Sequence, residues 1–140
     1  MKNKNIAKQD RQLITGEISS LLEKKKDIIF AYIYGSFVRS DKFSDIDIGI
    51  FVRKKRSLEP LNYEFKFEKE IQSFIHLPVD VRIINHAPLS FVYNVIKEGI
   101  LITDKDASIR ADFEGIIFKK YLDFAFFRKQ YLKEVVNAPI

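Results

Sequence analysis

The pattern of apolar and polar positions divides the chain into alternating helices and short strands. Apolar residues recur at helical spacing over residues 6–25, about 60–74, about 88–99 and 107–135. Short runs rich in β-branched and aromatic residues predict strands at 28–34, 45–52, 79–84 and 100–103. This order predicts an α/β (α+β) fold, in which about four strands form a small mixed sheet covered by helices.

The helical spacing also predicts which side chains face the core. In the first helix these are Ile6, Leu13, Ile14, Ile18, Leu21 and Leu22, and in the second Leu61, Phe65, Phe67, Ile71 and Phe74. The last helix is long, and its apolar residues include Phe113, Ile117, Tyr121, Phe124, Phe127 and Tyr131. Because this is more aromatic surface than one small sheet needs, we expect part of residues 107–135 to bind a partner.

Composition narrows the protein class. A chain of 140 residues favours a single domain over residues 1–140. It has no cysteine, which excludes a disulfide framework, a thiolate zinc site and a cysteine nucleophile, and suits the cytoplasm. The longest apolar run, residues 28–34, is far shorter than a membrane span. The net charge of +5 suits an anionic partner without identifying it.

A glycine-serine turn follows the first predicted strand. Gly35 and Ser36 come directly after Tyr34, where the chain must leave the strand and start a short helix. Glycine allows the backbone to approach a ligand closely. The amides and the Ser36 hydroxyl at a helix start can bind phosphate oxygens. Arg39 is a candidate contact to a triphosphate, and a plain surface arginine is the alternative.

Asp45 and Asp47 indicate that a metal ion could bind next to the turn. Residues two apart on a strand share a face, with Cα atoms roughly 6–7 Å apart, so the two carboxylates repel each other unless a cation binds them. Oxygen donors suit Mg²⁺, and a two-ion site can promote phosphoryl displacement. An exposed strand-end pair is the alternative.

Asp80 is the candidate for a third carboxylate. It stands among apolar residues on a predicted strand that could lie beside residues 45–52. There it would bind metal and take a proton from an acceptor hydroxyl. The alternative is a structural aspartate paired with Arg82 or Lys66. His76 and His86 flank the same strand and are interpreted as structural or surface residues.

These residues resemble the DNA polymerase β-like nucleotidyltransferase superfamily, specifically its minimal (MNT) branch. The shared pattern is a Gly-Ser turn, a Ser-Asp-x-Asp strand and a later aspartate, here Gly35-Ser36, Ser44-Asp45-Ile46-Asp47 and Asp80. Segments 97–101 and 121–124 resemble the distal part of MNT antitoxins paired with HEPN-domain toxins. The loop between Ser36 and Asp45 has eight residues, where these proteins most often have ten.

The resemblance implies a polymerase β-like fold and a function. It implies catalytic and metal-binding roles for Asp45, Asp47 and Asp80, and nucleotide binding by Gly35, Ser36, Arg39 and Ser44. ATP would be the substrate, two Mg²⁺ ions the cofactors, and a tyrosine of a HEPN ribonuclease toxin the acceptor.

Two rival functions stay open. The chain could neutralise its partner by binding alone, or it could modify RNA or a small hydroxylated molecule. Nucleic acid is not the expected partner, because the sequence has no separate single-strand-binding module with aromatic stacking platforms.

Overall fold

A four-stranded mixed sheet forms the centre of the described part of the chain. The computed structural model describes residues 4–5, 8–54 and 58–137. The strands are β2 (Ile28–Tyr34), β4 (Ile46–Val52), β5 (Val79–Ile83) and β6 (Ile100–Asp104), in the order β5-β4-β2-β6. β4 runs antiparallel to β2 and parallel to β5, and β6 runs antiparallel to β2. The predicted mixed sheet is confirmed.

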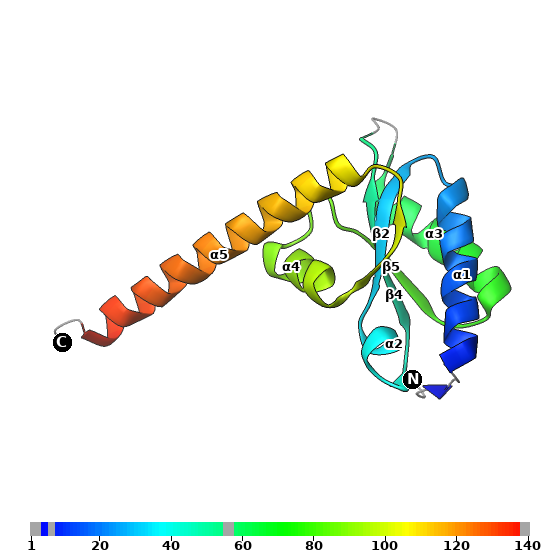
Figure 1. Cartoon of the computed structure of the whole chain (residues 1–140), viewed down its shortest axis with the longest axis horizontal. Coiled ribbons are helices and arrows are strands. Elements are labelled where there is room, and N and C mark those ends of the chain that lie inside the picture. The colour runs from blue at the N-terminus through cyan, green and yellow to red at the C-terminus, as the bar shows by residue number, and fades with distance from the viewer. Residues whose placement is uncertain (1–3, 6–7, 55–57, 138–140) are drawn as a thin grey trace.

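Helices cover both faces of the sheet (Figure 1). α1 (Lys8–Lys24) and α3 (Pro60–Ile75) bury Ile18, Leu22, Phe67 and Ile71 against one face. α4 (Leu89–Glu98) and the start of α5 (Ala107–Asn137) bury Val92, Val95 and Ile117 against the other. β4 alternates as predicted: Ile46, Ile48, Ile50 and Val52 all lie in the first core, while Asp47 and Phe51 point to the opposite face.

Several side chains predicted to be buried are exposed. Leu13 on α1 is 66% exposed, and Leu61, Phe65 and Phe74 on α3 are 74%, 57% and 41% exposed. Each helix packs only one stripe against the sheet, so these apolar residues fall beside the stripe and face outward. The predicted first helix begins at Lys8 in the structure. Ile6, predicted to face the core, lies outside the described residues.

α5 leaves the domain after its first turns (Figure 1). Ile117 is buried, and the Tyr121 ring stacks on Tyr93 of α4 with 3.8 Å between ring centres. Beyond this point most large apolar side chains are exposed, among them Phe127 at 68% and Tyr131 at 64%. No helix in the described residues has both the length and the apolar character needed to cross a membrane.

A second, two-stranded sheet includes part of the loop between the Gly-Ser turn and β4. β1 (Lys4–Asn5) pairs antiparallel with β3 (Lys42–Phe43), and the four-residue helix α2 (Ser36–Arg39) precedes β3. The sequence pattern did not predict this pair of strands. It matters for function because the loop that contains β3 joins Ser36 to Asp45.

Candidate functional site

The Gly-Ser turn has the backbone geometry of a helix start. Gly35 has φ +82° and ψ −157°, a conformation that side-chain-bearing residues rarely adopt. Its carbonyl accepts hydrogen bonds from the amides of Val38 and Arg39, at 3.1 and 3.2 Å. The amides of Ser36 and Phe37 precede these donors in the first turn, where a helix has no earlier carbonyl to offer. This end of α2 therefore suits an anion.

Asp47 lies directly against Gly35. Tyr34 pairs with Asp47 across β2 and β4, which brings the start of β4 to the turn. A Cβ atom built on Gly35 would overlap Asp47 Oδ2. The sequence predicted a glycine for close approach of a ligand, and the structure places a carboxylate of the chain itself at that position. Glycine at position 35 thus allows the turn and the carboxylate to lie together.

Asp80 joins Asp47 through the sheet. The two residues are register partners on the parallel strands β4 and β5, which lie roughly 4.8 Å apart. Asp80 Oδ1 is also 3.4 Å from Arg82 Nε, and both side chains are partly exposed. The structure therefore contains both the predicted neighbour of Asp47 and the Arg82 contact named as the structural alternative.

The three carboxylates form one electrostatic unit. Burial raises the pKa of Asp47 to about 6, and the negative charges of Asp80 and Asp45 add to this effect. Arg82 and Arg39 oppose it only in part. Burial, followed by the charges of Asp47 and Asp80, also raises the pKa of the Tyr34 hydroxyl. The site therefore carries excess negative charge, which a cation would neutralise.

The donor set fits Mg²⁺. Asp45 Oδ1 is buried and has no hydrogen-bond partner in the described structure, so it needs one from outside the chain. All three side chains offer carboxylate oxygens, which are the ligands that Mg²⁺ prefers. Among the described residues, no group of three His, Cys, Asp or Glu side chains is arranged so that it could hold a metal ion by itself. The carboxylates could thus hold Mg²⁺ together with water and substrate oxygens, as this ion commonly requires.

Arg39 stands at the rim of the site. It is exposed at the end of α2, and its Nη1 lies 3.5 Å from Glu98 Oε2. Together with Tyr34, Gly35, Phe91 and Asn94 it lines a depression of about 380 Å³. Its positive charge also opposes the raised pKa of Asp47. A role in binding triphosphate stays a prediction.

Ser44 lies between β3 and Asp45, where it is half-buried. Asp45 and Asp80 line a second depression of about 640 Å³ with Gln72 and His76. His76 ends α3 in the left-handed conformation, with φ +62°, and its amide donates to the Gln72 carbonyl. His76 thus ends α3 through its backbone, and it borders the same depression as Asp45 and Asp80, which no local sequence pattern marks.

Arg11 is a site-supporting residue that the sequence did not reveal. Its guanidinium donates to the main-chain oxygens of Phe37 and Ser40, one within α2 and one directly after it. It also lies over the Phe37 and Phe43 rings, at 5.2 and 5.3 Å from their centres. These rings pack edge to face. Arg11 thus fixes the eight-residue loop between Ser36 and Asp45 through contacts with Phe37, Ser40 and Phe43.

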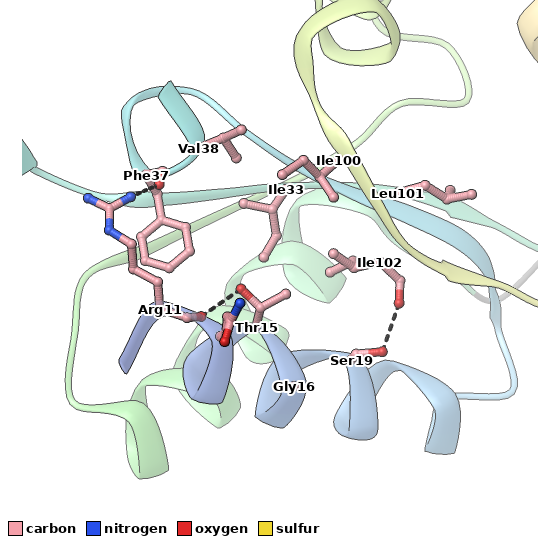
Figure 2. Close-up of a pocket in the computed structure, with 11 residues that line it drawn as sticks. Arg11, Thr15, Gly16, Ser19, Ile33, Phe37, Val38, Ile100, Leu101 and Ile102 are labelled. Carbon is pink, nitrogen blue, oxygen red and sulfur yellow. Dashed lines mark hydrogen bonds between the residues drawn. The ribbon is translucent and has the colours of Figure 1, made fainter. Parts of the chain in front are cut away.

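A separate apolar groove lies next to this anchor (Figure 2). It has a volume of about 560 Å³ between α1, α2 and β6, and Arg11, Phe37, Val38 and Ile102 are among its lining residues. None of the predicted site residues lines it. The segment 35–39 therefore borders two separate hollows. Phe37 and Val38 line the groove, whereas Gly35 and Arg39 line the depression of about 380 Å³.

Comparison with known proteins gives a family and a fold. Residues 16–108 match the family described as "Polymerase beta, Nucleotidyltransferase". This range contains Gly35, Asp45, Asp47 and Asp80. No curated protein sequence matches the chain.

Solved structures share the fold over nearly their whole length. One is described as a tri-AMPylated Shewanella oneidensis HEPN toxin in complex with an MNT antitoxin; it is 19% identical, with a TM-score of 0.69, over 90% of this chain and 98% of that one. Another is described as the toxin-antitoxin MntA-HepT, at 18% identity and a TM-score of 0.67, over 89% and 98% of the two chains. A third, described as a toxin-antitoxin with AMP-PNP, is 15% identical with a TM-score of 0.65, over 93% and 99%. At these identities the likeness establishes the fold alone.

Proposed function

Because the chain belongs to the polymerase beta nucleotidyltransferase family, we propose that it transfers AMP from ATP to a hydroxyl group of a protein partner. The observation that carries this proposal is the position of Asp47, which lies against Gly35 on one side and beside Asp80 on the other. An anion-binding turn and a group of carboxylates thus adjoin each other. Phosphoryl transfer needs this combination, because both the phosphates and the metal ions must be held at the reacting bond.

Each site residue has a role in this proposal. The amides at the start of α2 and the Ser36 hydroxyl bind phosphate oxygens, and Arg39 leaves Glu98 to contact the triphosphate. Ser44 borders the nucleotide beside Asp45. Asp45, Asp47 and Asp80 hold Mg²⁺, with two ions as the expected number. When bound, Mg²⁺ neutralises the phosphate charge and stabilises the attacking and leaving oxygens.

The transfer itself is a displacement at the α-phosphorus of ATP. The acceptor oxygen forms a bond to this phosphorus, the bond to the β-phosphate oxygen breaks, and pyrophosphate leaves. Asp80 takes the acceptor proton on Oδ2, since its Oδ1 faces Arg82. The partial exposure of Asp80 leaves room for an acceptor from another protein.

The proposed partner is a HEPN-domain toxin, which the exposed half of α5 would bind. Two facts support this choice. One structure that shares the fold is described as a HEPN toxin in complex with an MNT antitoxin, and another as a toxin-antitoxin. In addition, α5 carries exposed apolar residues beyond its contacts with the rest of the fold. A tyrosine is the expected acceptor. A cytoplasmic location, where such a pair would meet, stays a prediction.

The test is transfer of label. The purified chain is incubated with ATP labelled at the α-phosphate, Mg²⁺ and the protein encoded by the neighbouring gene. We expect label on the partner with wild type and none with Asp45→Asn/Asp47→Asn. Asp41→Asn is the matched control, because this exposed aspartate lies in the same loop outside the site. Transfer by the double variant, or none by wild type, would contradict the proposal.

A purely steric antitoxin is the second candidate function. The exposed apolar face of α5 favours it, because such a face can block a partner without chemistry. The same double variant separates the two functions: a steric antitoxin would still neutralise the toxin when Asp45 and Asp47 are asparagines. An RNA or small-molecule acceptor would instead show as label outside the partner.

A further inference from the structure

β5, the strand that carries Asp80, lies at an edge of the sheet. The backbone N–H and C=O groups of Asp80 and Arg82 point toward β4. Those of Val79, Val81 and Ile83 point outward, away from the sheet. An edge strand normally leaves such groups to water or to a pairing partner. Here α3 packs along the edge and supplies side chains to these groups.

Three residues of α3, spaced four apart, make these contacts. Glu64 Oε2 accepts from the Ile83 amide at 2.7 Å, and Glu68 Oε1 accepts from the Val81 amide at 2.8 Å. Gln72 Nε2 donates to the Val79 carbonyl at 3.2 Å. Residues at this spacing lie on one face of a helix, so each successive turn of α3 binds one outward group of β5.

Glu68 holds the residue next to Asp80. It is half-buried, and besides the bond to the Val81 amide its carboxylate lies beside that of Asp80. Asp80 is fixed on its inner side by the pairing with β4, opposite Asp47. Loss of the Glu68 bond would free the outer side of the strand at the point where Asp80 must meet the other two carboxylates.

We propose that Glu68 is a positioning residue, which holds β5 so that Asp80 stays beside Asp47 in the metal-binding arrangement. This inference rests on the proposed function, because it assigns Asp80 to the metal site. One substitution distinguishes this positioning role from an effect of the Glu68 charge. A glutamine at position 68 keeps a carbonyl oxygen for the Val81 amide and loses only the charge.

The experiment measures binding of Mn²⁺ alone to the full-length chain by electron paramagnetic resonance, with exchange of the Val81 amide followed by NMR. We expect Glu68→Ala to weaken Mn²⁺ binding about tenfold, because loss of a group that orients a metal ligand commonly has an effect of this size. We also expect this variant to exchange the Val81 amide hydrogen faster than wild type. Glu68→Gln should remain within about threefold of wild type. Glu64→Ala, which removes the bond at Ile83, is the control and should also stay within about threefold.

Two outcomes would overturn the proposal. One is wild-type Mn²⁺ binding by Glu68→Ala together with faster Val81 exchange, and the other is a defect in Glu68→Gln as large as that in Glu68→Ala. If the alanine variant does not fold, Glu68→Asp takes its place, because its shorter side chain cannot span the same distance. Failure of the proposed function gives a different result, namely wild type that binds Mn²⁺ and transfers no AMP.

Discussion

A Cβ atom at position 35 would lie 3.3 Å from Asp47 Cγ and would overlap Asp47 Oδ2. The glycine of the Gly-Ser turn and the Asp47 carboxylate are therefore packed directly against each other. Two constraints act on position 35, the positive φ of the turn and the space that Asp47 takes. Position 35 thus links the fold of the turn to the chemistry of the site.

Gly35→Ala tests this link. The methyl group would strain a backbone conformation that is essentially restricted to glycine, by about 1–3 kcal/mol, and displace the Asp47 carboxylate. We expect AMP transfer to fall at least tenfold, and Tm to fall by a few degrees, measured by label transfer and calorimetry. Gly115→Ala is the control, since nothing lies within 4 Å of the added atom on α5. A fully active Gly35→Ala protein would refute the close packing.

Asp47 gives the free protein a pH dependence. The raised pKa of about 6 means that its proton stabilises the folded state. This stabilisation is complete below the unfolded pKa near 4 and is lost as pH rises through 6. Because the side chain is half-buried, we expect screening by water to limit the effect to about 1 kcal/mol.

The measurement compares unfolding of wild type and Asp47→Asn without metal at pH 4.5 and pH 7.5. The variant should be the more stable protein at pH 7.5, and this advantage should shrink at pH 4.5. Mg²⁺ should stabilise wild type at pH 7.5 and lose this effect below pH 6, where Asp47 is protonated. Equal pH profiles for the two proteins would rule out a raised pKa of Asp47.

Arg11→Ala tests the support of the Ser36–Asp45 loop. The change removes two donated hydrogen bonds to the main chain of α2 and the residue after it, and the contact with the Phe37 and Phe43 rings. We expect a loss of about 2 kcal/mol in stability and weaker ATP binding, measured by calorimetry. Arg128→Ala removes the same charge from an exposed position of α5. If both variants bind ATP equally well, Arg11 does not support the nucleotide site.

Local rules explain what the sequence could predict. The alternation in β4 follows from the two-residue period of a strand, so the shared apolar face of Ile46, Ile48 and Ile50 could be deduced without a structure. Gly35 could be assigned to a turn because few other residues accept its backbone conformation. The pairing of Asp80 with Asp47 also agreed with the expected neighbouring strands.

The features that the sequence could not predict depend on contacts between elements that are far apart in the chain. Arg11 binds residues 26 and 29 positions away, and no local pattern marks such a contact. Glu64 and Glu68 have the spacing of a solvent-exposed helix face, although they bind the edge of β5. Phe65 fits an apolar stripe, but only the packing of α3 decides that it faces outward.

Glu114 anchors α5 to the sheet. It accepts hydrogen bonds from the Tyr32 hydroxyl and Arg110 Nη1, both at 2.6 Å, and Arg110 Nε donates to Asp104 at 2.7 Å. Glu114→Ala should cost about 2 kcal/mol, because the buried Tyr32 hydroxyl loses its acceptor. In a Tyr32→Phe background the same change should cost less, which a double-mutant cycle of unfolding free energies measures. Additive costs would show that the two side chains do not interact.

The exposed half of α5 should bind the partner through its aromatic residues. Phe127 and Tyr131 are four positions apart, so they share one face of the helix, and each is more than 60% exposed. Phe127→Ser should weaken binding to the HEPN-domain protein about 30-fold, the effect of losing an aromatic anchor worth about 2 kcal/mol. Stability should change by less than about 0.5 kcal/mol, because the side chain packs on little of its own fold.

Phe65→Ser is the matched control for this prediction. Phe65 is 57% exposed on α3, so the substitution removes a similar area of exposed aromatic surface from a different face of the molecule. Calorimetric titration with the partner should give wild-type affinity for this variant. If both substitutions weaken binding equally, the partner covers α3 as well as α5. If neither does, α5 is not the binding surface, and its aromatic face must serve contacts with another molecule.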